Sequence, residues 1–143
     1  MDSNELKRLL DDVSQGRIAP DEAFRQLRWK PFEKMGDFAT VDLHRRLRCG
    51  FPEVIFGQGK TPDQIVAILG RILQHGEGGM VTRLSPEAAQ RLVREFPEGE
   101  YFELGRVFRV RSPKDPGPRL GKAVVVTAGT ADLPVAEEAR LTA

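Results

Sequence analysis

The chain has a single cysteine, Cys49, and almost no excess of charge of either sign. One cysteine cannot form an internal disulfide, and its presence fits a reducing compartment. The 22 Lys and Arg residues nearly balance the 21 Asp and Glu residues, which leaves a formal net charge of +1. A chain with this balance has no global electrostatic attraction to nucleic acid or to an anionic membrane surface. We therefore expect neither of them as a partner.

Long apolar runs are also missing. No stretch approaches the roughly 20 apolar residues of a membrane span, and the amino terminus has no basic segment followed by an apolar run. We therefore expect a cytoplasmic protein. Its 143 residues, 40% hydrophobic and 30% charged, suffice for one domain with a core, or for one domain and a fragment of a second.

Two short amphipathic helices are predicted at the amino terminus. The first ends before Gly16, where a left-handed C-cap is often needed. The second, residues 20–28, opens with proline and two acidic residues, as helix starts commonly do, and directs Phe24 and Leu27 inward. Together they predict a helical hairpin. The inward residues of the first helix are Leu6, Leu9, Leu10 and Val13.

The middle of the chain alternates between short β-branched segments and amphipathic helices. This succession predicts a small α/β unit with the order β-α-β-α-β-β. The last two strands flank Gly105 and Arg106, which predicts a hairpin. The predicted strands are residues 53–56, 78–84 and two within 101–110, preceded by a possible strand at 38–43, and the predicted helices are 62–75 and 86–96, the latter with Ala88, Ala89, Leu92, Val93 and Phe96 inward.

The composition changes at residue 112. Residues 112–121, SPKDPGPRLG, are rich in proline and glycine and predict an interdomain linker. The run KAVVVT, residues 122–127, is typical of a strand buried on both faces of a parallel sheet, and a turn and the start of a helix follow it. We therefore expect three parts: a domain at 1–111, the linker, and the truncated start of a second domain at 122–143.

The stretch GFPEVIFGQGKT, residues 50–61, ends like a nucleotide-binding P-loop. A P-loop needs a glycine where Val54 stands, so we exclude that motif. Thr61 and Gln64 instead fit a capping box with proline at the first helical position. The two glycines and Lys60 exceed what a cap requires, and Lys60 therefore stays a candidate contact for a ligand or another domain.

An arginine-rich segment, DLHRRLRCGFPE at residues 42–53, overlaps this stretch. Arginine favours bidentate binding of phosphate or carboxylate, which makes Arg45 and Arg48 candidate contacts. The neighbouring acidic residues favour the alternative of a solvated, mutually neutralised loop. No histidine is placed as a base for Cys49, so we predict no nucleophilic role for it. His44 and His75 are too far apart, without further ligand spacing, to predict a metal site.

Two long segments carry a resemblance to a known family. They read VDLHRRLRCGFPEVIFGQGKTPDQIVAI, residues 41–68, and VVVTAGTADLPVAEEA, residues 124–139. The sequence resembles the LarB family, the pyridinium-3,5-biscarboxylic acid mononucleotide synthases of nickel-pincer nucleotide cofactor biosynthesis. The resemblance covers the whole of this chain, but it covers only about the first half of a family member. It implies an amino-terminal domain followed by the first strand, loop and helix start of a doubly wound domain similar to PurE, the phosphoribosylaminoimidazole carboxylase.

The resemblance implies a carboxylase and hydrolase. Members of the LarB family carboxylate the pyridinium ring of nicotinic acid adenine dinucleotide and cleave the phosphoanhydride, releasing AMP. It further implies CO2 as co-substrate, Mg2+ as a candidate metal of the complete enzyme, no cofactor held by this chain, and a homo-oligomer formed through the PurE-like domain. The catalytic cysteine and acid are expected beyond residue 143, and Cys49 does not match that cysteine, so this chain alone is expected to be inactive.

One loop of the family's substrate site carries over to this sequence. Gly129, Thr130, Ala131 and Asp132 correspond to the loop for the substrate phosphate and ribose, at the carboxyl end of the expected strand. Ala131 stands where a serine is common, which removes one hydroxyl donor. Asp132 has the alternative role of a plain helix N-cap.

The alternative function is a stand-alone nucleotide- or protein-binding module that uses Arg45, Arg48 and Lys60.

Overall fold

A computed structural model describes residues 3–27, 32–42, 45, 49, 51–111 and 121–143. Over these residues the chain is a mixed α/β protein with five α-helices and two sheets, which agrees with the predicted class. It forms two compact units, Met1–Glu53 and Val54–Ala143, and each is described by itself. Apart from the exposed Gly121, the predicted linker lies outside the described residues.

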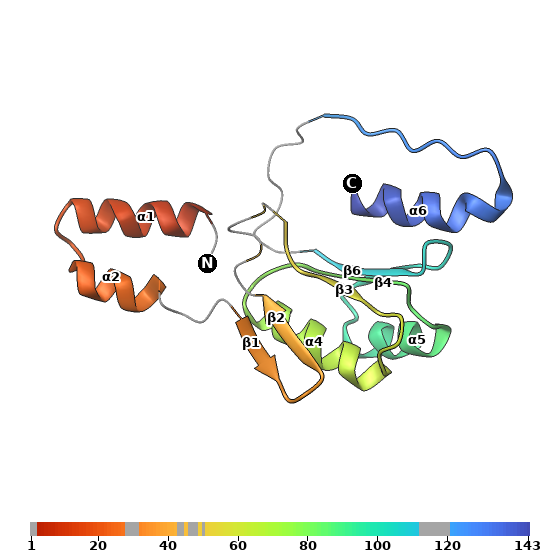
Figure 1. The fold of residues 1–143 in the computed structure, drawn as a ribbon, viewed down its shortest axis with the longest axis horizontal. Helices are drawn as coiled ribbons and strands as arrows, with labels where there is room; N and C mark the ends of the chain where they lie inside the picture. Colours follow the sequence, from red (N-terminus) through yellow and green to blue (C-terminus); the bar gives the residue numbers. More distant parts are fainter. Residues whose placement is uncertain (1–2, 28–31, 43–44, 46–48, 50, 112–120) are drawn as a thin grey trace. The chain divides into compact units, whose positions relative to one another are not determined.

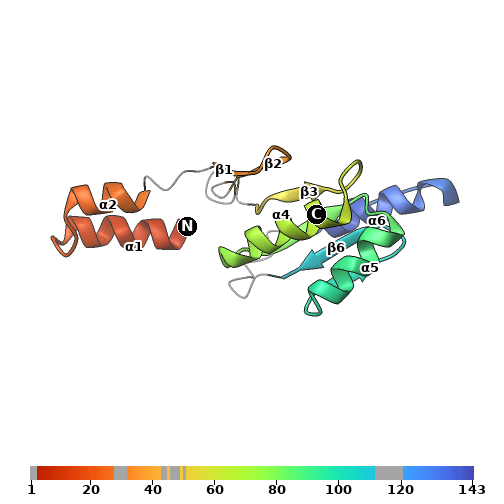
Figure 2. The same cartoon turned by 90° about the horizontal axis from the view of Figure 1, so that it is seen from below.

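Two helices open the first unit, α1 (Ser3–Ser14) and α2 (Pro20–Leu27). They lie side by side in Figures 1 and 2. Gly16 has a φ of 71°, and its N–H donates to the carbonyl of Val13 at 3.0 Å. Glycine adopts this left-handed conformation without steric cost, so α1 ends where the sequence predicts.

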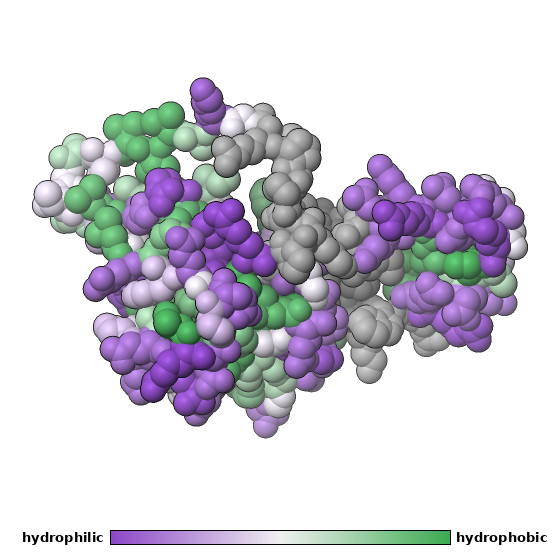
Figure 3. All heavy atoms as spheres, turned by 180° about the vertical axis from the view of Figure 1, so that it is seen from behind, coloured by the Kyte–Doolittle hydropathy of each residue, from purple (hydrophilic) through white to green (hydrophobic). Residues whose placement is uncertain are grey.

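The apolar face between these helices is smaller than predicted. Leu9 and Ala23 are buried, but Leu10 is 53% exposed and Phe24 is 62% exposed. The prediction that Phe24 points inward was wrong, because two short helices have too little surface to enclose a large aromatic side chain. Figure 3 shows apolar side chains of this pair at the surface, between polar ones.

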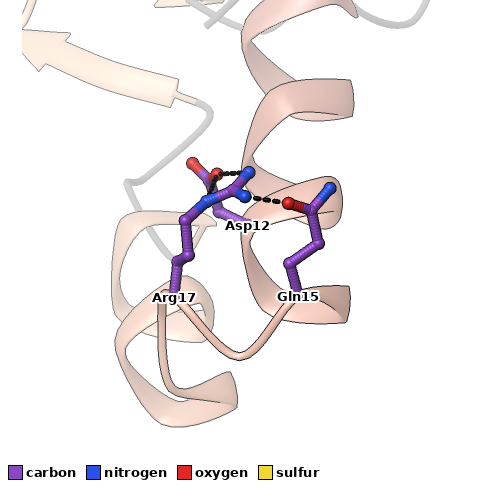
Figure 4. A network of polar contacts seen from close by, with 3 residues as sticks. All are labelled: Asp12, Gln15 and Arg17. Carbon is purple, nitrogen blue, oxygen red and sulfur yellow. Dashed lines mark hydrogen bonds and ion pairs between the residues drawn. The ribbon is translucent and has the colours of Figure 1, made fainter.

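A polar network joins α1 to the turn that follows it (Figure 4). Arg17 Nε donates to Asp12 Oδ1 at 2.7 Å, and the other guanidinium nitrogens contact Asp12 and Gln15. Since Arg17 is exposed, such an ion pair contributes at most about 1 kcal/mol to the free energy of unfolding. The network therefore orders the turn and adds little to stability.

A two-stranded ribbon completes the first unit. Strand β1 (Phe32–Met35) pairs antiparallel with β2 (Ala39–Asp42), and Gly36 in the connecting turn has a φ of 54°. The strand at 38–43 was predicted within a residue of β2, but β1 was not predicted. Its residues alternate in exposure without a run of β-branched side chains, so it lacks the composition that marks a strand.

The second unit is built on a four-stranded mixed sheet. Its strands occur in the order β3-β4-β6-β5, with β3 parallel to β4 and the other pairs antiparallel. The register places Ile55 opposite Val81 and Val81 opposite Phe108, and all three side chains are buried. The strands are β3 (Val54–Phe56), β4 (Gly79–Thr82), β5 (Glu100–Phe102) and β6 (Val107–Val110).

Helices α4 (Pro62–Gln74) and α5 (Pro86–Glu95) lie on one side of this sheet, so the predicted β-α-β-α-β-β order is confirmed (Figure 1). Gly79 lets α4 approach closely, because a Cβ there would lie 2.3 Å from Leu69 Cδ1. Each large apolar side chain buried in this layer contributes about 1.5–3 kcal/mol. The buried helical residues are Ile65, Ile68, Leu69, Ile72, Ala88, Ala89 and Leu92.

The start of α4 forms the predicted capping box. Gln64 N donates to Thr61 Oγ1 at 3.3 Å, and Thr61 N donates back to Gln64 Oε1 at 3.0 Å. The two bonds satisfy amides that have no partner inside the helix. Ser85 caps helix α5, and its hydroxyl accepts from Ala88 N at 3.1 Å.

The predicted strand at residues 122–127 does not form in this chain. These residues have no strand assignment, and Val124 and Val126 are 83% and 86% exposed. The prediction was wrong for the chain by itself, because a β-strand exists only when a neighbour receives its hydrogen bonds. A short helical turn (Thr130–Asp132) and helix α6 (Leu133–Thr142) follow, as the predicted turn and helix start require.

The capping box of α4 gives a test of this fold. Thr61→Ala removes the side-chain oxygen that accepts from Gln64 N, and we expect a loss of about 1 kcal/mol in the free energy of unfolding, measured in urea. Thr61→Ser keeps the oxygen and should unfold close to the unchanged protein. Equal stability of the Ala variant and the original protein would contradict the role given to this cap.

Candidate functional site

Three of the five amides in the turn from Gly57 to Thr61 have acceptors within the protein. Gly57 N donates to Thr82 O at 2.8 Å, and Lys60 N donates to Gly57 O at 3.1 Å. Thr61 N is held by the capping box. A P-loop needs a longer run of consecutive free amides to surround a phosphate, so the geometry agrees with the exclusion of that motif.

Lys60 has an intramolecular partner. Its Nζ donates to the carbonyl of Phe56 at 2.9 Å, which closes the same turn. This bond accounts for a lysine at this position without a ligand.

The other residues proposed from the arginine-rich segment are only partly described. Arg45 and Cys49 are exposed, and Arg48 lies outside the described residues. His75 contacts the carbonyl of Arg71 through Nδ1 at 2.9 Å. Over the described ranges, no three His, Cys, Asp or Glu side chains gather into a possible metal site.

The loop that the resemblance assigns to phosphate and ribose, Gly129 to Asp132, is exposed throughout. Asp132 N donates to Gly129 O at 3.2 Å, which folds the loop into one helical turn. Asp132 makes no side-chain capping bond to α6. Among the described residues, the amides of Thr130 and Ala131 have no hydrogen-bond acceptor. The loop therefore offers two amides and a hydroxyl near the start of a helix, which suits an anion.

Helix α6 contacts the turn between β5 and β6 in the second unit. Glu138 Oε2 lies 2.6 Å from Arg83 Nε, and Leu141 is buried. A Cβ on Gly105 would lie 3.1 Å from the amide nitrogen of Glu138 and 3.3 Å from Leu141 Cδ1. A side chain at this position would push the helix away by a few tenths of an ångström. One salt bridge and one buried leucine thus hold α6, ten residues that begin directly after the loop.

A cavity of about 640 Å³ opens between α5 and the β5–β6 turn. Its walls combine apolar and charged side chains. The lining residues are Leu84, Pro86, Ala89, Gln90, Val93, Arg94, Tyr101, Glu103 and Arg106.

Two arginines with left-handed backbone stand beside this cavity. Arg83 has a φ of 55° and Arg106 a φ of 53°, a conformation that costs energy in residues with a Cβ. It is held by hydrogen bonds: Leu84 N donates to Arg106 O at 3.1 Å, and Arg106 Nε donates to Leu84 O at 2.6 Å. The guanidinium group of Arg106 is therefore fixed against the turn.

Tyr101 contributes a neutral phenol to the cavity. Burial raises its pKa above the ordinary value near 10, the negative charge of Glu103 raises it further, and Arg106 opposes both effects. The phenol therefore stays a hydrogen-bond donor at neutral and mildly alkaline pH.

Sequence comparison places this architecture in a family. A family model described as the LarB/PurE-like N-terminal domain matches residues 32–112, more than half of the chain. The chain belongs to the LarB family. The match begins at β1 and runs just past β6, so it includes the capped α4, the mixed sheet and the cavity.

One curated protein is similar to nearly the whole of this chain. It is the uncharacterized protein MJ0165 of Methanocaldococcus jannaschii, 28% identical over 140 residues. The alignment covers 94% of this LarB-family chain and 55% of the relative. The chain therefore spans about half the length of the curated relative that it matches.

The cavity was not predicted from the sequence. Val93 was assigned to the inward stripe of α5, which was wrong, because its side chain is 47% exposed and lines the cavity. The sequence feature that could have indicated the cavity is Arg106 at a tight turn after a glycine, since a residue with a Cβ takes a left-handed conformation only where the surroundings hold it.

In the part of the chain that the structure describes, no helix is long and apolar enough to cross a membrane.

Tyr101 is the single tyrosine of the chain, so an alkaline absorbance titration reports its phenol alone. We expect a midpoint above about 10, because burial disfavours the phenolate. Glu103→Gln should lower the midpoint by removing a negative charge, and Glu98→Gln, an exposed change of the same kind, should leave it in place. A midpoint at or below the ordinary value would contradict the described surroundings of Tyr101.

Proposed function

We propose that this chain is the amino-terminal part of a LarB-type synthase of nickel-pincer nucleotide cofactor biosynthesis. The complete protein would carboxylate the pyridinium ring of nicotinic acid adenine dinucleotide and hydrolyse its phosphoanhydride, releasing AMP. The observation that carries this proposal is the family match over residues 32–112. The resemblance of residues 124–139 to the start of the PurE-like domain supports it independently.

The chain's own contribution to that reaction is the loop Gly129 to Asp132. The free amides and the hydroxyl of Thr130 bind a substrate phosphate, as amides at a helix start bind anions. The carboxylate of Asp132, not used as a helix cap, is available to accept a hydrogen bond from a ribose hydroxyl. Ala131 adds no donor beyond its amide.

Chemistry on the pyridinium ring belongs to residues outside this chain. The cysteine that adds to the ring and the acid that handles its proton have no counterpart here, and Cys49 receives neither role. The described residues offer no cluster for Mg2+, so no step is assigned to a metal held by this chain.

We further propose that the domain that ends at residue 111 positions the loop. Helix α6 begins directly after the loop and is held within the second unit through Arg83 and Gly105. The complete enzyme would then extend as a PurE-like domain, joined through residues 112–121, and would assemble into a homo-oligomer. In that domain residues 122–127 would find the strand neighbours that they lack here.

The alternative function is a stand-alone nucleotide- or protein-binding module that uses Arg45, Arg48 and Lys60. It has less support, because one of the three ammonium donors of Lys60 already binds the carbonyl of Phe56.

Substrate binding by the loop can be tested in a protein that contains this chain together with the PurE-like domain. With nicotinic acid adenine dinucleotide and bicarbonate, we expect release of AMP and a carboxylated product, followed by mass spectrometry. Thr130→Ala should raise KM by about tenfold, because it removes one hydrogen bond to a charged group. Thr142→Val, at the far end of α6, should leave KM unchanged. Absence of AMP release would contradict the function, and equal KM values for the two variants would contradict the role of the loop.

The alternative is tested with the isolated chain. If the chain is an inactive part of a synthase, titration with AMP or dinucleotides followed by calorimetry should give no affinity that depends on the arginine-rich segment. Tight binding of AMP that is lost in the double variant Arg45→Ala/Arg48→Ala, and retained when Arg25 and Arg91 are changed to Ala instead, would favour the binding module.

A further inference from the structure

The cavity beside α5 has no part in the proposed function, yet it has the features of a ligand site. Its volume of about 640 Å³ falls in the range of small-molecule pockets, roughly 300–1,000 Å³. It is formed by α5 and the turn after β5, all within one compact unit. Its charged residues lie around apolar walls, and such a combination recognises molecules that have both an apolar body and a charge.

We propose that this cavity binds a small organic anion: a carboxylate carried on a flat, apolar body. The charge of its lining favours one negative charge on the ligand. Arg94 and Arg106 supply two positive charges and Glu103 one negative charge, so a monoanion is neutralised, whereas a phosphate dianion is opposed by Glu103.

The donors of the cavity have capacity left for such an anion. Arg106 donates through Nε to Leu84 O and through Nη2 to Arg83 O at 3.5 Å. Within the described residues its Nη1 has no acceptor. Arg94 donates through Nε to Gln90 O at 3.3 Å, and within the described residues its two Nη atoms have no acceptor. A guanidinium group binds a carboxylate through paired N–H donors, and the neutral phenol of Tyr101 adds a further donor.

The apolar walls account for the body of the ligand. Leu84 and Ala89 are almost fully buried at the base, and Val93 is 47% exposed although it lies on the face of α5 beside the core. A flat ring seated here would cover Val93 and gain the free energy of burying apolar surface. The site is held ready, since the left-handed turns at Arg83 and Arg106 are fixed before any ligand arrives.

Tyr101 offers a direct probe of the cavity, because it is the only tyrosine of the chain. Incorporation of 3-fluorotyrosine gives one fluorine resonance, which can be followed by NMR as benzoate is added to the 143-residue chain. We expect a saturable shift at millimolar benzoate. Benzamide has the same flat body without the charge and should bind more weakly, and acetate has the charge without the body and should also bind more weakly.

Matched variants on α5 separate the site from general electrostatics. Arg94→Gln should weaken benzoate binding about tenfold, since it removes a charged donor. Arg91→Gln removes the same charge from the same helix, where Arg91 pairs with Glu95 at 3.1 Å outside the cavity, and should change the affinity by less than about twofold.

Three results would overturn the proposal. They are the absence of a saturable benzoate shift, equal affinities for benzoate and benzamide, and equal losses in the Arg94→Gln and Arg91→Gln variants. The test uses neither nicotinic acid adenine dinucleotide nor the PurE-like domain, so its outcome is separate from that of the proposed synthase activity.

Discussion

The reciprocal hydrogen bonds between Leu84 and Arg106 are the constraint on which the second unit depends. Leu84 N donates to Arg106 O, and Arg106 Nε donates to Leu84 O. They tie the connection from β4 to α5 to the turn between β5 and β6, although 22 residues separate them in the chain. Both the cavity and the contact of α6 with Gly105 are built on that joined pair of turns.

The helix starts of α4 and α6 differ in how their backbone amides are satisfied. At α4, Thr61 and Gln64 satisfy each other, and the amides of Gly57 and Lys60 in the preceding turn also have acceptors. At α6, Asp132 makes no capping bond, and over the described residues the amides before it stay unsatisfied. Because an unsatisfied amide favours an anion, the loop before α6 is the stretch for which we propose phosphate binding.

The sheet itself is small, and close packing compensates for its short strands. Its strands have three or four residues each, so few ladder hydrogen bonds are available. Glycines bring the layers together: a Cβ on Gly79 would meet Leu69, and one on Gly99 would lie 2.2 Å from the ring of Phe108. Such contacts leave little tolerance for added volume at these two glycines.

The sequence by itself determined the order of the elements from β3 to β6, the capping box at Thr61, the left-handed helix end at Gly16 and the family. These features depend on neighbours along the chain, through periodicity, caps and turn residues. Only the tertiary structure decided that Phe24 is exposed, that residues 122–127 form no strand alone, and that Val93, Tyr101 and Arg106 share a cavity. Burial and strand pairing depend on surfaces brought together from distant parts of the chain. Local sequence patterns do not predict which distant segments meet.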